Sequence, residues 1–187
     1  VELYFDNFRM ETVEDVFRRV TYVPQRTPRD LPARDGPALI VFSRPWMDHV
    51  FPNEWPGDQE AISVLSLRAA RGEYEPITFS VAARRSIKGL KVEVGELTGP
   101  GRISRPNLDL RVVRTLDKRW TYHDRKMRYI ADVPVWLAPQ PDGGVDLQAG
   151  RVATFWLTVH VPESARPGTY RCQITITGLD GGPSRQV

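Results

Sequence analysis

The stretch Thr154–Gly178, TFWLTVHVPESARPGTYRCQITITG, contains two runs in which apolar and polar residues alternate. Such alternation is typical of half-buried β-strands, because it places one set of side chains on a core and the other outward. Between the runs, Pro162, Pro167 and Gly168 are expected to end the first strand and turn the chain into the second. We therefore predict a β-hairpin. The inward sets are predicted to be Phe155, Leu157, Val159 and Val161, followed by Tyr170, Cys172, Ile174 and Ile176.

The same pattern of short runs and turns extends back along the chain to about Glu60. Several short strands between turn signals, without a long helical pattern, indicate an all-β fold. We predict an antiparallel β-sandwich of about seven to nine strands, with immunoglobulin-like or jelly-roll topology. The candidate strands are Ala38–Ser43, Ile62–Ala69, Glu75–Ala83, Leu90–Gly95, Leu108–Leu116, Val133–Leu137, Arg151–Val161 and Thr169–Thr177.

The first third of the chain has a different character. Val1–Met10 is predicted to be a strand, and Thr12–Val20 a short helix with an N-cap threonine. Residues 21–37 contain four prolines and many charges, which favours an extended linker. We divide the chain into an irregular extension, residues 1–59, and a sandwich domain, residues 60–187. The first ten residues lack the features of a signal peptide, and we expect the chain to be a piece of a longer polypeptide.

Composition and charge exclude several classes of protein. The 187 residues carry a net charge of +3, are 41% hydrophobic and include one cysteine. A single cysteine rules out an internal disulfide and a cysteine-rich metal site. No apolar run approaches the roughly 20 residues of a membrane-spanning helix. We predict a solvated, ion-paired surface rather than a nucleic-acid footprint, and no cofactor.

The acidic and histidine residues do not assemble into an obvious site. Glu73 and Glu75 suggest the carboxyl pair of a glycosidase, but two positions on one strand cannot flank a sugar ring. A structural role, pairing with arginine or accepting backbone N–H groups, is the preferred interpretation. Asp142–Asp146 could hold calcium, although a plain turn is preferred. The histidines lack metal-ligand spacing, so no metal site is predicted. They are His49, His123 and His160.

The segment Arg111–Arg128 is the most basic of the chain, and aromatic residues interrupt it. Basic and aromatic residues together are favoured where one domain docks on another. We predict docking on an acidic neighbouring domain or a solvated loop, with sugar contact and nucleic-acid binding as alternatives. The candidate docking residues are Arg111, Arg114, Arg119 and Arg125.

Three tryptophans lie in predicted loops. An exposed indole ring could stack on the face of a sugar, whereas a covered ring would close an end of the sandwich or an interface between domains. Both interpretations stay open. Trp136 and Trp156 lie in predicted strands and are expected to be packed. The candidate carbohydrate-binding residues are Trp46, Trp55, Trp120 and Tyr122.

Several of these segments also resemble a known family. LRAARGEYEPITFSV (Leu67–Val81), LKVEVGEL (Leu90–Leu97) and LDLRVV (Leu108–Val113) are similar to segments of one accessory domain, as is the Thr154–Gly178 stretch. This domain is the β-sandwich that precedes the catalytic barrel in proteins resembling glycoside hydrolase family 123. The resemblance covers roughly Gln59–Gly178, with a departure at Cys172, where the family usually has glycine.

The resemblance implies a noncatalytic accessory domain of a larger, secreted bacterial glycoside hydrolase-like protein. It would support a C-terminal catalytic barrel, which would be an intramolecular partner outside this chain. Because the family's catalytic acids belong to that barrel, none can be assigned here. The implied location is extracellular or periplasmic, with no nucleic-acid or membrane partner. The alternatives are a carbohydrate-binding module that uses loop aromatics to hold polysaccharide, and an enzyme in its own right.

Overall fold

The computed structural model describes residues 36–48, 50–52, 54–57, 59–121, 127–179 and 185–186. For 115–121, 127–136 and 185–186, only the course of the backbone is described. The expected strand Val1–Met10, the helix Thr12–Val20 and most of the linker 21–37 lie outside these residues. Where the structure is described, no helix is long and apolar enough to cross a membrane.

The described residues form β-strands and one 3-10 turn (Arg105–Asn107), and they contain no α-helix. The prediction of an all-β fold is therefore confirmed. The strands are β1 (Leu39–Phe42), β2 (Tyr74–Ala83), β3 (Ile87–Val94), β4 (Leu97–Thr98), β5 (Arg102–Ile103), β6 (Leu108–Thr121), β7 (Met127–Pro139), β8 (Val145–Leu147), β9 (Val152–His160), β10 (Ile174–Thr177) and β11 (Arg185–Gln186).

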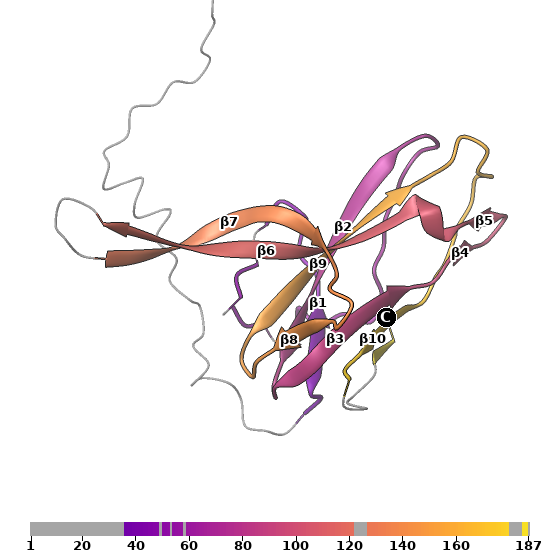
Figure 1. Cartoon of the computed structure of the whole chain (residues 1–187). Helices are drawn as coiled ribbons and strands as arrows, with labels where there is room; N and C mark the ends of the chain where they lie inside the picture. The colour runs from indigo at the N-terminus through magenta and orange to yellow at the C-terminus, as the bar shows by residue number, and fades with distance from the viewer. Residues whose placement is uncertain are drawn as a thin grey trace, which may run out of the picture.

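β9, the first run of the Thr154–Gly178 stretch, is the central strand of the larger sheet. This antiparallel sheet has five strands in the order β1-β2-β9-β6-β7 (Figure 1). β9 pairs with β2 along its whole length and with β6 at Leu108–Val112. The alternation of β9 is as predicted, because Phe155, Leu157 and Val159 are buried and the residues between them are half-buried.

The predicted β-hairpin is wrong, because its two runs belong to different sheets. β10 lies in a four-stranded sheet of order β11-β10-β3-β8, and β9 does not belong to it. The connection, residues 161–173, crosses from one sheet to the other. Near the end of this connection, Arg171 exchanges backbone hydrogen bonds of 2.8 and 2.9 Å with Thr98. Alternation specifies which side of a strand faces the core, but it does not specify the neighbour with which the strand pairs.

The two sheets enclose one apolar core. Phe79 and Phe155 are cross-strand partners with stacked rings whose centroids lie 5.5 Å apart. From the second sheet, Leu90 and Ile176 are fully buried against the same cluster. Burying each such side chain contributes roughly 1.5–3 kcal/mol to folding. The structure is thus a β-sandwich, as predicted.

A smaller apolar cluster lies on the opposite, outer face of the five-stranded sheet. Here the loop of residues 43–60 folds over β1 and β2, and Trp55 packs with Phe42 and Val152. β1 pairs with β2 from Leu39 to Phe42, so the sandwich already begins before the predicted boundary at residue 60. The loop is therefore part of the sandwich.

The predicted strand Ile62–Ala69 is also wrong. Near it, only Ala61 makes a bridge, to Phe42, and residues 62–70 run beside β2 without a strand ladder. Val64 is 71% exposed. Ile62 and Leu65, three positions apart, both pack against the core, which departs from the period of two that a strand requires.

β6 and β7 continue beyond the sandwich as a two-stranded arm. β6 pairs with β9 as far as Val112, and after that it pairs, within the described residues, with β7 alone. We call residues 113–121 and 127–137 the β6–β7 arm. It is about 30 Å long by the rise of an extended strand, and it projects past the other strands (Figure 1). The predicted strands Leu108–Leu116 and Val133–Leu137 cover only its base.

Candidate functional site

A partly buried ion-pair cluster holds the loop that carries Trp46. The Arg44 Nε donates to Glu60 Oε1 at 2.7 Å, and its Nη2 donates to Glu60 Oε2 at 3.0 Å. Its Nη1 pairs with Glu54, whose side chain is 6% exposed. The hydrogen bond that Arg44 donates to Glu60 is the main cause that raises the pKa of Arg44 above its ordinary value, and burial opposes it. Thr78 of β2 donates to the Arg44 carbonyl at 3.1 Å. The loop is therefore fixed to the sheet.

The structure separates two of the tryptophans predicted to bind sugar. Trp46 is 50% exposed, and its ring meets that of Trp156 edge to face, with centroids 5.8 Å apart. Trp55 is only 5% exposed, and the Arg84 guanidinium lies over its ring. A covered ring cannot stack on a sugar, so the prediction for Trp55 is wrong and its alternative, a tryptophan that covers the sandwich, applies.

The other predicted site residues lie at the base of the arm, farther along it, or outside the described residues. The Arg111 side chain is 37% exposed and donates to Asp109 at 2.7 Å, which raises the pKa of Arg111. Arg114 is half-buried at the start of the arm. For Trp120 and Arg119 only the backbone is described, and their predictions stay predictions. Tyr122 and Arg125 lie outside the described residues.

Sequence reasoning missed a row of polar and aromatic residues along the outer face of β9. Trp156 is half-buried and its Nε1 donates to Thr158 Oγ1 at 3.1 Å. Farther along, the His160 ring stacks on Tyr74 at 4.2 Å. We call Trp46, Tyr74, Trp156, Thr158 and His160 the outer strip. The signal was present in the alternation, because an inward Phe155 requires an outward Trp156.

The His160 imidazole is also fixed in orientation. Its Nδ1 lies 2.9 Å from Asn107 Oδ1, an atom that can only accept a hydrogen bond. The Nδ1 therefore carries the proton, and in the neutral ring the Nε2 is left as an acceptor. Tyr74, which is 68% exposed, covers one face of this ring.

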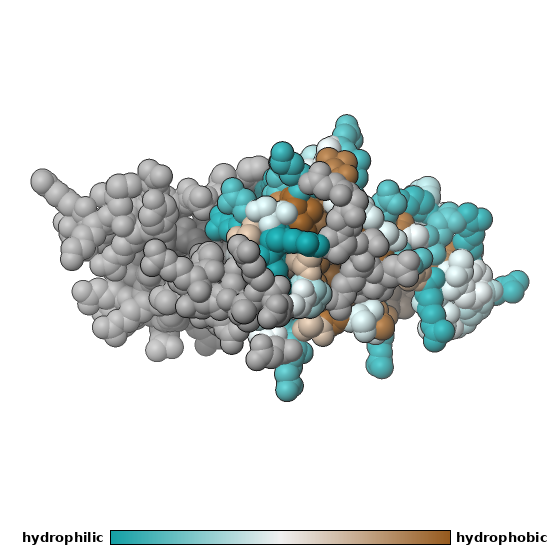
Figure 2. All heavy atoms as spheres, turned by 90° about the horizontal axis from the view of Figure 1, so that it is seen from below, coloured by the Kyte–Doolittle hydropathy of each residue, from teal (hydrophilic) through white to brown (hydrophobic). Residues whose placement is uncertain are grey.

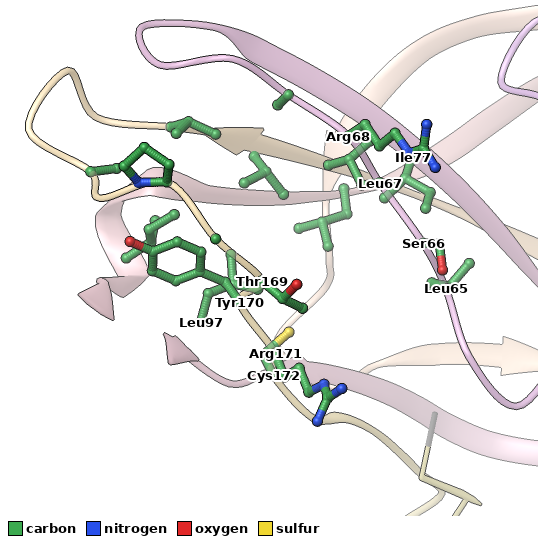
Figure 3. A pocket seen from close by; sticks show the side chains of 18 of the residues that line it. Leu65, Ser66, Leu67, Arg68, Ile77, Leu97, Thr169, Tyr170, Arg171 and Cys172 are labelled. Atoms are coloured by element: carbon green, nitrogen blue, oxygen red, sulfur yellow. The ribbon is translucent and has the colours of Figure 1, made fainter. Parts of the chain in front are cut away.

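A cleft of about 960 Å³ opens where residues 64–71 face residues 165–172 (Figure 3). Its floor is apolar and includes Ile77, Leu157 and Val159. Its described lining has four arginines and no carboxylate or imidazole. Burial raises the pKa of the Cys172 thiol in its wall, which keeps the thiol protonated and weakly nucleophilic. The cleft is suited to contact with an apolar surface rather than to acid–base chemistry.

On the face seen in Figure 2, hydrophilic side chains project at several places and small apolar areas lie between them.

No group of three or more histidine, cysteine, aspartate or glutamate residues with the geometry of a metal site occurs in the described part.

Comparison with known proteins decides the family. The family model of the glycoside hydrolase 123 N-terminal domain matches residues 48–178. The chain belongs to this family. A solved structure that matches is a family 123 glycoside hydrolase from Clostridium perfringens, analysed for glycolipid glycan hydrolysis. It is 13% identical, with a TM-score of 0.48, over 63% of this chain and 20% of that chain. No curated protein matches.

The resemblance seen in the sequence is thus confirmed, and the family 123 match begins eleven residues earlier than Gln59. It takes in the part of the loop 43–60 that carries Trp55, whereas Trp46 lies just before residue 48. This chain spans about a fifth of the length of the Clostridium protein.

Within this family 123 domain, the Gly72–Pro76 motif has a structural use. Gly72 has a φ of +80°, which favours glycine, and Glu73 accepts the Ala70 N–H at 2.7 Å. The structural interpretation of Glu73 is confirmed. The turn at Asp142–Gly144 is confirmed as well, since Gly144 N–H donates to the Pro141 carbonyl and Asp146 accepts the Gly89 N–H.

Proposed function

We propose that this family 123 domain is a noncatalytic accessory domain of a larger, secreted glycoside hydrolase-like protein. It packs against a C-terminal catalytic barrel and supports it. The observation that carries the proposal is the family match, because the matched domain is named for its N-terminal position in glycoside hydrolases.

Three carboxylates of the sandwich already have structural partners, which favours an accessory role of the domain over a catalytic one. Glu54 and Glu60 are held by Arg44, and Glu73 accepts a backbone N–H. A glycosidase needs two carboxyl groups that face each other across a sugar. The carboxylates of the Arg44 cluster instead face a shared guanidinium, which holds the pKa of Glu60 below its ordinary value.

The β6–β7 arm is the element best placed to contact the barrel. A two-stranded ribbon is marginally stable in water by itself, so an arm of this length gains from a surface that covers it. Its described strands carry Arg114, Lys118, Arg119 and Arg128 against Asp117 and Asp132. This excess of positive charge favours an acidic surface on the partner domain.

The direct test compares the parent polypeptide with and without this domain. Removal of the domain is expected to lower the melting temperature of the barrel by several degrees and to reduce its rate of glycoside hydrolysis. Unchanged stability together with unchanged kinetics would contradict the proposal. Robust turnover of aryl glycosides by this chain alone would contradict the noncatalytic role.

A second variant of the parent tests the arm separately. Replacing residues 115–135 with Asn-Gly joins Arg114 to Trp136, which are cross-strand partners, through a two-residue turn. We expect this variant to lose most of the stabilisation that the whole domain provides. If the shortened arm supports the barrel fully, the contact lies on another surface of the domain.

The extracellular or periplasmic location is part of the proposal and has its own test. Fractionation of cells that produce the parent protein is expected to recover it from the periplasm or the medium. Recovery from the cytosol alone would contradict secretion.

A further inference from the structure

We propose that the outer strip is a binding site for a neutral oligosaccharide. This goes beyond the accessory role, because it assigns to the domain a ligand of its own. The outer strip runs along β9, the central strand of the five-stranded sheet, on the face opposite the main core. It has aromatic rings at both ends and polar side chains between them.

One end of the outer strip is built from two indole rings at an angle. Trp46 and Trp156 meet at an interplanar angle of 70°, so together they form a corner rather than a flat stack. The C–H bonds on the face of a pyranose ring make that face apolar, and it packs favourably on an aromatic ring. The corner therefore offers one indole face beneath a sugar ring and a second indole beside it.

A hollow of about 300 Å³ adjoins this corner. Its lining includes Trp46, Pro76 and Thr78, so it lies between the loop and the outer face of β2. The strand register places Thr78 next to Trp156 and Pro76 next to Thr158. The hollow thus gives room for a ring-sized group directly beside the aromatic corner.

The middle of the outer strip is polar but electrically balanced. The register places Arg111 beside Trp156 and Asp109 beside Thr158, and these two charged side chains pair at 2.7 Å. Both remain partly exposed, at 37% and 57%. A guanidinium offers donors and a carboxylate offers acceptors, which matches the mixed demands of sugar hydroxyls. Because each charge cancels the other, the pair favours a neutral ligand over an anionic one.

The far end of the outer strip repeats the combination of ring and hydrogen-bonding group. Tyr74 presents an exposed ring, and the His160 imidazole stacked on it carries a second ring nitrogen, Nε2, as a further hydrogen-bonding atom. From Trp156 to His160 the strand rises by about 13 Å, so the site is longer than one sugar ring. This length points to an oligosaccharide rather than a monosaccharide.

The site is also largely formed before a ligand arrives. Arg44 fixes the loop that carries Trp46, the bond to Thr158 orients Trp156, and Asn107 orients His160. Side chains that are already held in place lose little conformational freedom on binding, which favours affinity.

Affinity electrophoresis of this chain tests the proposal. The chain carries a net charge of +3, so it is run toward the cathode in native gels. Separate gels contain hydroxyethylcellulose, xyloglucan, galactomannan or glycol chitin, all of them neutral polysaccharides. Retarded migration is expected in at least one gel. Because no barrel is present, failure of this test is distinguishable from failure of the accessory role.

Three variants locate the site. In the gel that retards the wild type, Trp46→Ala and Trp156→Phe are expected to weaken binding, the former by at least about tenfold. Met47→Ala is the matched control, since Met47 is 70% exposed beside Trp46, and it is expected to bind like the wild type. Trp46 is half exposed on a loop, so its replacement leaves the core intact, which the urea midpoint verifies. Absence of retardation in all four gels, or retardation of Trp46→Ala equal to that of the wild type, would overturn the proposal.

Discussion

The two halves of β6 have different neighbours. Leu108–Val112 pairs with β9, and Leu108 and Val112 are buried in the main core at 7% and 3% exposure. From Val113 onward the same strand pairs, among the described residues, with β7 alone. The first half therefore draws its stability from within the chain, whereas the second half is a ribbon of the kind that is marginal in isolation. We call the sandwich without the β6–β7 arm the body. The body is stabilised by its own core, whereas the arm is suited to contact with a partner domain.

The largest effect is expected for the core of the body. Phe155→Ala removes a ring that is completely buried and stacked on Phe79. We expect a loss of about 3–5 kcal/mol in the free energy of unfolding, from lost burial and the cavity left behind. Urea unfolding of this chain measures it. A loss below about 1 kcal/mol would mean that the body does not depend on this core.

The ion-pair cluster beneath the Trp46 loop is expected to have the next largest effect. Arg44→Ala leaves the Glu54 carboxylate, which is 6% exposed, without its guanidinium. We expect a cost of about 2–4 kcal/mol, measured by urea unfolding at neutral pH. The matched control is Arg102→Ala, because the Arg102–Glu96 pair is exposed at 67% and 33%. That variant should lose less than about 1 kcal/mol, and equal losses would refute the distinction.

The same cluster predicts a pH dependence. Hydrogen bonds from Arg44 hold the pKa of Glu60 below its ordinary 4.5, and burial opposes this. A lowered folded-state pKa gives stability that is fully present above the unfolded value and is lost as the pH falls through the folded one. Unfolding free energies measured from about pH 7 down to about pH 3 should therefore decline below 4.5. Glu60→Gln should flatten that decline, and an unchanged slope would contradict the assignment.

The smallest effect on this chain is expected for the arm. Replacement of residues 115–135 by Asn-Gly should change the free energy of unfolding by less than about 1 kcal/mol, because a two-stranded ribbon contributes little to the body. Urea unfolding of this chain measures it. A loss as large as that of Phe155→Ala would remove the distinction between body and arm.

Some of this structure could be predicted from the sequence, because it depends on local patterns. The alternation in β9 identified Phe155, Leu157 and Val159 as core residues. The pairing of β9 and β10 with different sheets could not be predicted, since partners depend on residues far apart in the chain. The same limit applies to Leu90 and Ile176, which meet Phe155 in one core only after both sheets form.

In the candidate site, too, local patterns could be predicted from the sequence and contacts between distant residues could not. An outward Trp156 follows from the phase of its strand, but its contact with Trp46 depends on the Arg44 cluster that folds the loop over the sheet. The burial of Trp55 has the same cause. The full length of the arm was not predicted, for another reason. Its basic and aromatic residues suggested a docking segment or a solvated loop. The β6–β7 register also shifts on both sides of Thr115, whose partner Pro134 lacks an N–H.

Hydrogen exchange of the arm amides tests the central claim most directly, with this chain alone compared with the parent polypeptide. We expect residues 113–121 and 127–137 to exchange at least about tenfold more slowly in the parent, because the barrel covers them, while β9 exchanges equally in both. Equal exchange of the arm in the two proteins would contradict the claim that it supports a partner domain.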